Sequence, residues 1–378
     1  MIRNFKYRIY PTKKQEKTLN TTFTNCRRLY NVALQHRNDV WRSYRKSVSC
    51  YDQINELPKI KEEFPQYKEI HSQVLQNVLV RVDLAFKGFF RRLKIKKEGC
   101  GFPRFKGEDR FKSITYLQSG FDFTKDKKRI KLSKIGLVKI RAHRQIPIGA
   151  KTKTCCIKKE ADKWYCVLSL DIPFATVEKK VVRDYRAIGI DLGLTDFAVL
   201  SNGEEIKNPK YLKQSEAKLK ETQSRYSKEK TKATKKKLVK LHYKVANQRK
   251  DFQHKLSSQL VNRFDLIAYE DLNVKGMMKD DRYKLNKHIG DASWSSFISM
   301  VKYKAESAGT YAIAVNPKGT SQKCSGCGAV VKKDLYVRVH ACPVCSLSLS
   351  RDHNAAINIL ASGTDARLSE APSPLGKG

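Results

Sequence analysis

The alternation of apolar and polar residues predicts a strand followed by two helices at the start of the chain. Residues 2–10 alternate as a β-strand, which Pro11 ends. Thr12 and Gln15 have the spacing of a helix capping box and predict a helix that runs to about residue 46. A second helix is expected over about 69–95, with an apolar stripe that consists of Leu75, Val78, Leu79, Val82, Phe86, Phe89 and Phe90.

The other face of this second helix is basic and consists of Arg81, Lys87, Arg91 and Arg92. Such a face is either solvated or turned towards nucleic acid. From 101 to 173 the chain changes to short alternating runs, which favour antiparallel strands of a small barrel or sandwich. The opening strand can join this sheet. Cys155, Cys156 and Cys166 fall in these strands and are interpreted as core residues, since no partner pair has metal-site spacing.

The second half of the chain alternates apolar strands with helices. Residues 187–194 and 195–200 predict a hairpin, and Asn202-Gly203 favours a tight turn after it. A long basic helical stretch follows at about 209–264, and then buried-type strands at 266–270 and 310–315. Ser293 is expected to cap the helix between those strands, and a last helix is expected from about Asp352 to Leu360.

The charge of the chain points to a polyanionic partner. Among 378 residues there are 77 Lys and Arg against 37 Asp and Glu, a net charge of +40. Such self-repulsion is relieved when nucleic acid binds, and a membrane surface is the weaker alternative because the basic residues are spread over the whole chain. No signal-peptide run or spanning segment is seen, so we expect a cytoplasmic, nucleoid-associated prokaryotic protein with no membrane partner.

Four cysteines near the end of the chain form the most specific motif. Cys324, Cys327, Cys342 and Cys345 read as C-x2-C, fourteen residues, then C-x2-C, which is the spacing of a zinc ribbon. Four thiolates close the coordination shell, so this Zn²⁺ is predicted to be structural. A nucleic-acid contact is an alternative role for the ribbon, through residues between its two cysteine pairs: Lys332, Lys333, Arg338 and His340.

Three acidic residues occupy places where carboxylates can meet at one edge of a sheet. Asp191 and Glu270 each end an apolar strand, and Asp352 begins the last helix. Clustered carboxylates repel one another unless divalent cations bind them. Two Mg²⁺ ions roughly 3.5–4 Å apart can activate a water and stabilise the leaving oxygen of a phosphodiester. The pattern predicts hydrolysis on an RNase H-like sheet. Asp196 and Asp271 are not assigned to the metals.

Five motifs in the C-terminal half together resemble the TnpB family of transposon-encoded, RNA-guided DNA endonucleases. They are GIDLG (189–193), YEDLN (269–273), TSQKCSGCG (320–328), CPVC (342–345) and RDHNAAINI (351–359). Two N-terminal motifs, YRIYPTKKQ (7–15) and GFPRFK (101–106), are also similar to this family. The resemblance therefore covers nearly the whole chain.

The resemblance implies a multidomain α+β protein with a wedge-type β-barrel, an inserted helical recognition lobe and an RNase H-like (RuvC) α/β nuclease domain that contains the zinc ribbon. The expected domains are the barrel at 1–11 and 100–175, the lobe at 12–99, a linker at 176–185, the RuvC domain at 186–319 and 348–362, the ribbon at 320–347 and a disordered tail at 363–378.

The resemblance also implies a function: a Mg²⁺-dependent hydrolase that cuts both strands of double-stranded DNA. A guide RNA from the transposon end would pair with the target beside a short transposon-adjacent motif. Asp191, Glu270 and Asp352 would be the catalytic triad. Tyr51, Gln76 and Ser113 are candidates for contacts to the adjacent motif. No HNH-type signature is seen, so one site would cut the two strands in turn, and the protein is expected to be a monomer.

Three other functions stay open on the sequence. The chain could be a guided DNA-binding regulator with little cleavage, although its acidic triad is intact. It could be an unguided RNase H-like resolvase, which would not need a helical lobe or so much positive charge. A cysteine-rich, RNA-binding structural protein would show no metal-dependent nuclease activity.

Overall fold

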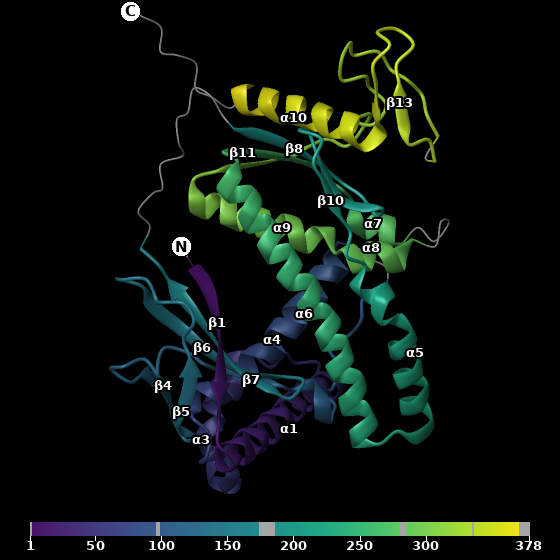
Figure 1. Cartoon of the computed structure of the whole chain (residues 1–378). Coiled ribbons are helices and arrows are strands. Elements are labelled where there is room, and N and C mark those ends of the chain that lie inside the picture. Colours follow the sequence, from purple (N-terminus) through teal and green to yellow (C-terminus); the bar gives the residue numbers. More distant parts are fainter. Residues whose placement is uncertain (1, 96–98, 174–185, 280–284, 335, 370–378) are drawn as a thin grey trace, which may run out of the picture. The chain divides into compact units, whose positions relative to one another are not determined.

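The computed structural model of the chain describes residues 2–95, 99–173, 186–279, 285–334 and 336–369 (Figure 1). The chain is mixed α+β and forms two compact units, Met1–Phe174 and Ala175–Gly378, each of which is described by itself. The linker predicted at 176–185 lies outside the described residues.

An antiparallel seven-stranded sheet, in the order β2-β6-β7-β1-β5-β4-β3, forms the frame of the first unit. The strands are β1 (Ile2–Tyr10), β2 (Ser113–Tyr116), β3 (Phe121–Phe123), β4 (Arg129–Leu132), β5 (Gly136–Arg141), β6 (Lys151–Glu160) and β7 (Lys163–Asp171). The opening strand β1 joins this sheet between β7 and β5, as expected. Among the described pairings none joins β2 to β3, so closure into a barrel stays a prediction.

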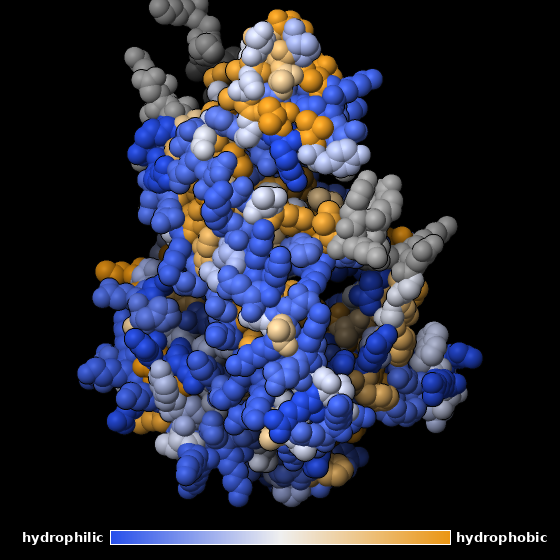
Figure 2. Space-filling view, turned by 45° about the vertical axis from the view of Figure 1, so that its right-hand side comes forward, coloured by the Kyte–Doolittle hydropathy of each residue, from blue (hydrophilic) through white to orange (hydrophobic). Residues whose placement is uncertain are grey.

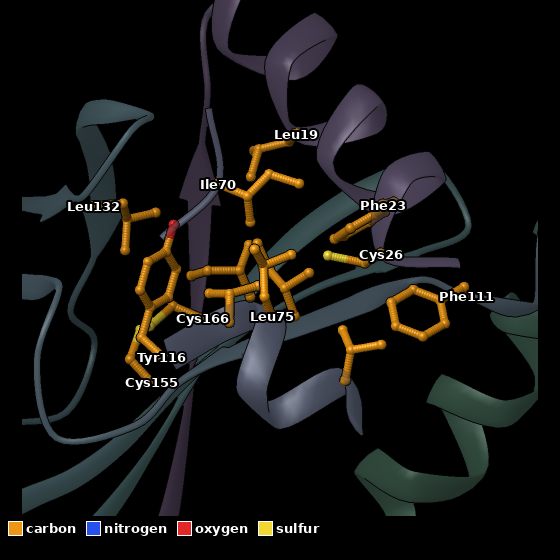
Figure 3. Close-up of a cluster of buried hydrophobic side chains, with 14 of the residues drawn as sticks. Leu19, Phe23, Cys26, Ile70, Leu75, Phe111, Tyr116, Leu132, Cys155 and Cys166 are labelled. Atoms are coloured by element: carbon orange, nitrogen blue, oxygen red, sulfur yellow. The ribbon is translucent and has the colours of Figure 1, made fainter. Parts of the chain in front are cut away.

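The helices of the first unit are α1 (Lys13–Tyr44), α2 (Cys50–Asn55), α3 (Leu57–Glu63) and α4 (Ser72–Lys94), with short 3₁₀ turns at Pro65–Tyr67 and Glu108–Arg110. Of these, α1 and α4 pack on the sheet (Figure 3). The predicted capping box is confirmed: the Gln15 amide donates to Thr12 Oγ1 at 3.3 Å. Alternate residues of the strands, such as Cys166 and Leu168, face α1 and α4, and Cys155 and Cys166 are buried in this core. Cys156, also predicted to be core, is only partly buried.

Two expectations for α4 are corrected. Its apolar stripe is buried as far as Val82, but Phe90 is 54% exposed, whereas the rings of Phe86 and Phe89 pack against Phe102. Arg81 is not on a freely solvated face. Its guanidinium donates to the Ser113 carbonyl at 2.8 Å and to Thr115 Oγ1 at 2.9 Å, so it joins α4 to β2.

The second unit is built on a five-stranded sheet in the order β10-β9-β8-β11-β12. The strands are β8 (Ala187–Leu192), β9 (Asp196–Leu200), β10 (Glu205–Lys207), β11 (Leu266–Glu270) and β12 (Tyr311–Val315), and a separate two-stranded sheet joins β13 (Val339–Ala341) to β14 (Ser348–Ser350). β8 to β10 are antiparallel, whereas β8, β11 and β12 run parallel. Gly203 adopts a left-handed φ of 86° in the predicted tight turn after β9.

The helices of the second unit are α5 (Tyr211–Glu229), α6 (Lys232–Arg263), α7 (Val274–Lys279), α8 (Asn286–Ala292), α9 (Trp294–Ala308) and α10 (Arg351–Ser369). Helices lie on both faces of the sheet (Figure 1), whereas α5 packs on α6. Ile190 and Ile267 pack with α6 and α9, whereas Leu266 and Ala268 pack with Ile359 of α10. The strands are therefore buried on both faces, which explains their continuous apolar runs.

The last helix is longer than expected. α10 continues to Ser369, so the prediction of disorder from residue 363 is wrong for 363–369, and 370–378 lie outside the described residues. Tertiary contacts hold the extension: a Cβ at Gly363 would stand 2.4 Å from Ala268 Cβ, and Arg367 donates to the Tyr311 hydroxyl at 2.9 Å. Local residue preferences alone did not show these contacts.

Hydrophilic residues predominate on the face shown in Figure 2, in keeping with the net charge of +40. The basic stretch of 221–250, with 11 Lys and Arg against 2 Glu, falls mostly on α5 and α6. A left-handed Lys230 separates the two helices, and Thr231 caps α6 by accepting from the Thr234 amide. Among the described helices, none has an apolar stretch long enough to cross a membrane.

Candidate metal centres

Two glycines of the GIDLG motif place Asp191 at the end of β8. A Cβ at Gly189 would stand 2.1 Å from the Ala356 carbonyl oxygen, so only glycine lets α10 lie this close to β8. A Cβ at Gly193 would stand 2.8 Å from the Asp196 carbonyl oxygen, inside the β8–β9 connection. The motif therefore brings α10 against β8 and turns the chain directly after Asp191.

Glu270 lies beside Asp191 because β8 and β11 are parallel neighbours. Their register pairs Tyr269 with Ile190, so the following residues, Glu270 and Asp191, end the two strands at the same edge. Both acids alternate with residues of the α6/α9 face and so belong to the α10 face. Carboxyl ends of parallel strands are where ligands bind in open α/β sheets.

Asp352 comes from the first turn of α10, where the helix dipole favours a negative charge. The Arg338 guanidinium lies 3.8 Å from its carboxylate. His353, the next residue, meets the Ser201 carbonyl through Nε2 at 3.1 Å and so ties the start of α10 to the β9 hairpin. The helix is thereby held with its N-terminus at the acidic edge of the sheet.

The pKa of Asp191 is affected by the charges of the other two acids. Burial raises the pKa of Asp191 to about 8, and the charges of Glu270 and Asp352 act in the same direction. Burial also raises the pKa of Glu270, while the hydrogen bond from Thr320 opposes that rise. Carboxyl groups that repel one another in this way are stabilised by a bound cation.

The spacing of the three carboxylates suits Mg²⁺, which is seldom bound by a closed cage of protein ligands. Among the described residues, the four cysteines are the group whose ligand atoms all come within 4.8 Å of one another, so the three carboxylates are spaced more widely. Mg²⁺ takes only a few carboxylates and completes its shell with waters and substrate phosphate oxygens. Asp191, Glu270 and Asp352 are the residues that could hold it.

The four cysteines of the ribbon meet in one cluster. Sγ of Cys324 lies 3.6 Å from that of Cys345, and Sγ of Cys327 lies 3.5 Å from that of Cys342. A tetrahedral Zn²⁺ with bonds of about 2.3 Å separates its sulfurs by about 3.8 Å, so the cluster fits zinc. Gly328 permits the first loop through its left-handed φ of 79°.

Asparagines of α10 join the ribbon to the acidic site. Buried Asn354 accepts from the Ser325 amide at 2.9 Å and donates to the Lys323 carbonyl at 2.8 Å, and Asn358 donates to the Thr320 carbonyl at 2.8 Å. Thr320 in turn donates from Oγ1 to Glu270 at 2.5 Å. The sequence reasoning missed these residues, although the i, i+4 spacing of the two asparagines on one helix face was a usable signal.

The alternative of a nucleic-acid contact through the ribbon loses two of its four candidate residues. His340 is 0% exposed, and the Lys333 amine lies against its Nδ1, so neither is free to reach a phosphate. Lys332 is exposed, and Arg338 is 63% exposed although it lies 3.8 Å from the Asp352 carboxylate, so the alternative stays open through these two residues. The burial of His340, which lies on β13, was not visible in the spacing of the cysteines.

The candidates for reading an adjacent motif all lie in the first unit. Tyr51 is 74% exposed on α2, Gln76 is partly exposed on α4, and Ser113 begins β2. Arg81 joins Ser113 to α4 by donating to its hydroxyl at 3.2 Å. Among the contacts of the described residues, none joins Tyr51 to the other two.

Three family models match the chain. They are described as "Helix-turn-helix domain" over residues 1–46, "Probable transposase" over 165–281 and "Cas12f1-like, TNB domain" over 294–359. Asp191 and Glu270 fall in the second match, and the four cysteines and Asp352 fall in the third. Each model covers less than half of the chain, and both candidate metal centres lie within the matched segments.

Relatives that match over most of their length define the family. A provisionally named RNA-guided DNA endonuclease of Streptomyces pristinaespiralis is 33% identical over 377 residues, covering 96% of this chain and 90% of that protein. InsQ of Escherichia coli K12, with the same provisional name, is 28% identical over 383 residues, covering 96% and 92%. A TnpB-like protein of Acanthamoeba polyphaga mimivirus, L770, is 25% identical over 414 residues, covering 96% and 73%. The chain belongs to the TnpB family.

Similarity to solved structures is weaker. The "mini-RNA-guided endonuclease CRISPR-Cas_phi3" matches 100% of this chain and 94% of its own, with 12% identity and a TM-score of 0.49. A likeness at this level supports no functional argument.

Proposed function

We propose that this chain is an RNA-guided DNA endonuclease that hydrolyses phosphodiester bonds with Mg²⁺. The observation that carries the proposal is the meeting of Asp191, Glu270 and Asp352 at one edge of the second sheet. Two relatives, similar over nearly their whole length, bear the name RNA-guided DNA endonuclease. An intact acidic site in such a chain supports cutting, rather than only binding, of DNA.

The topology of the second unit supports an RNase H-like (RuvC) nuclease fold for 186–319 and 348–362. Three antiparallel strands are followed by two parallel ones, with helices on both faces. The ribbon at 320–347 joins β12 to α10 and would brace the helix that carries Asp352. In the first unit, the sheet would be the wedge-type barrel and the helices within 12–99 would be the recognition lobe.

The residues of the acidic site would each have a distinct task. Asp191, Glu270 and Asp352 would hold two metal ions, and Thr320 would orient Glu270 through its hydroxyl. When bound, two Mg²⁺ ions would activate a water and stabilise the leaving 3′ oxygen. Since the pKa of Asp191 is raised to about 8, its carboxyl would hold a proton at neutral pH until a cation displaces it.

Guide RNA and double-stranded target DNA are the proposed partners. The net charge of +40 supports binding to phosphate backbones. A guide from the transposon end would pair with the target, while Tyr51, Gln76 and Ser113 of the first unit would contact the adjacent motif. The protein would act as a monomer and would cut the two strands in turn at its one acidic site.

Sequencing of RNA that co-purifies with the chain, followed by cleavage of a matching DNA in Mg²⁺, tests this function. Asp191→Ala should abolish cleavage and leave RNA-dependent DNA binding. Asp196→Ala is the matched control, because Asp196 lies on the same hairpin but pairs with Lys207 at 3.0 Å. Guided binding without cutting by the wild type would favour a regulator, and efficient cutting of junctions by RNA-free protein would favour a resolvase.

A further inference from the structure

A cavity of about 220 Å³ opens at the same edge of the second sheet, on the face that α9 covers. Its polar lining comprises Tyr269, Glu270, Asp271, Trp294, Ser295, Ser299 and Lys302. Of the three residues of the acidic site, Glu270 is the one that also lines this cavity, which it reaches from the end of β11. The other polar residues that line the cavity have no role in the acidic site described above.

The first turn of α9 faces this cavity and lacks a side-chain cap. Ser293, which was expected to cap the helix, adopts a left-handed φ of 52° and caps no amide. Its hydroxyl instead donates to the Gly290 carbonyl at 2.7 Å and accepts from Arg249 at 2.8 Å. The expected cap is therefore wrong, because the partly buried Arg249 takes the side chain. Amides at an uncapped N-terminus carry a partial positive charge that favours an anion.

Trp294 provides an independent sign of a missing acceptor. Its side chain is only 3% exposed and lines the cavity, and its Nε1 is buried with no hydrogen-bond partner among the described residues. Buried N–H groups are nearly always paired, so an orphan of this kind calls for an explanation. An anion in the cavity would supply the acceptor.

Lys302 adds a positive charge to the same wall. It follows Trp294 by eight residues, so both lie on one face of α9, and Lys side chains in helices extend towards the N-terminus. Its ammonium lies 5.5 Å from the centre of the Tyr269 ring. Two serine hydroxyls, of Ser295 and Ser299, complete the lining of this wall. The facing acids, Glu270 and Asp271, would be offset by cations held at Glu270.

We propose that this cavity binds a backbone phosphate of the DNA strand that is cut, with Lys302, the Trp294 indole and the amides of Trp294 and Ser295 as donors. The next two amides of α9, those of Ser296 and Phe297, donate to the Ser293 carbonyl. The proposal rests on the proposed function. Because Glu270 belongs to both the cavity and the acidic site, and nucleotides rise about 3.4 Å each along a duplex, the phosphate lies within about three nucleotides of the cut. Lys302 is thus a positioning residue, which orients the strand and does not touch the reacting atoms.

Cleavage by the guided complex tests the role of Lys302. Lys302→Gln should lower the single-turnover cleavage rate about tenfold without weakening target binding, and Lys302→Arg should restore most of it. Lys275→Gln is the matched control, because Lys275 is exposed on α7 next to a lining residue but does not line the cavity. It should leave the rate unchanged.

A scan with single neutral methylphosphonates separates a phosphate contact from a merely structural effect. At one position within about three nucleotides of the cut, the substitution should slow the wild type as much as Lys302→Gln does, and should not slow that variant further. The inference is overturned if every position slows the variant and the wild type by the same factor, or if Lys275→Gln is as slow as Lys302→Gln.

Binding of inorganic phosphate tests the cavity without any cleavage. The chain has three tryptophans, so its indole N–H groups give three NMR signals, and Trp294→Phe identifies the one of interest. Phosphate should shift that signal saturably, and Lys302→Gln should weaken the response. An unmoved Trp294 signal refutes the cavity even if the complex cuts DNA, whereas a shifted signal with no guided cleavage refutes only the proposed function.

Discussion

Replacing Asp191 with asparagine is expected to stabilise the metal-free protein and to remove its response to Mg²⁺. Burial, with Glu270 and Asp352 nearby, raises the pKa of Asp191 from 3.8 to about 8. Between these values the native state binds more protons than the unfolded chain, so the free energy of unfolding falls as pH rises. Asparagine has no proton to lose, so the advantage of the variant grows from about pH 4 to pH 8.

The size of this effect follows from the same two values. A pKa difference of about 4 is worth at most about 6 kcal/mol at pH 8, and nothing below pH 4. The measured gain should be smaller, because the neighbouring acids share the repulsion. Each 1 kcal/mol raises Tm by about 2–4 °C in a unit of this length.

Thermal unfolding in EDTA across this pH range measures the effect, followed by titration with Mg²⁺. Mg²⁺ should raise Tm of the wild type at pH 8 and leave Asp191→Asn almost unchanged, since binding to the native state alone stabilises it. Asp196→Asn removes one surface ion pair, worth up to about 1 kcal/mol, and keeps the response to Mg²⁺. Destabilisation of Asp191→Asn at pH 8, or an equal Mg²⁺ response in both proteins, would refute the reasoning.

Gly189→Ala should destabilise the second unit by about 1–3 kcal/mol or more and cut cleavage sharply, because its Cβ would stand 2.1 Å from the Ala356 carbonyl oxygen. Gly290→Ala meets nothing nearer than 3.6 Å and should be neutral in chemical denaturation; equal losses in both would contradict this account. Cys324→Ser should release zinc and lower cleavage by loosening the start of α10. Zinc content, Tm and cleavage rate measure this, and an unchanged Tm and cleavage rate would show that the ribbon does not support α10. Affinity for duplex DNA should fall with log salt at a slope of about −0.9 per neutralised phosphate, and a flat response would count against backbone binding.

Elements whose signals lie within a few residues were predicted well. The Thr12 capping box, the strands at 187–192 and 266–270 and the turn at Gly203 depend on local hydrogen bonds and local burial patterns. Ser293 shows the opposite case. Its residue type favours a cap, but Arg249, distant in sequence, takes its hydroxyl, so local preference gave way to a tertiary contact.

Sequence also supplied the chemistry of the site but not its construction. The residue types and positions of Asp191, Glu270 and Asp352 indicated carboxylates at the ends of elements. The supporting contacts from Thr320 and Asn354 come from segments 29 to 50 residues away in sequence, and no local pattern encodes such distances.

By itself, then, the sequence determined the cysteine ligands, the three acids and the family to which they belong, because these depend on residue identity and spacing. Only the tertiary structure decided that β8 and β11 run parallel in a register that ends Asp191 and Glu270 at one edge. It also decided that α10 lies close enough to bring Asp352 to them, since only the missing Cβ of Gly189 permits that approach. The physical reason is that the three carboxylates repel one another, so the site forms only because the packing of the whole sheet and its helices holds them in place.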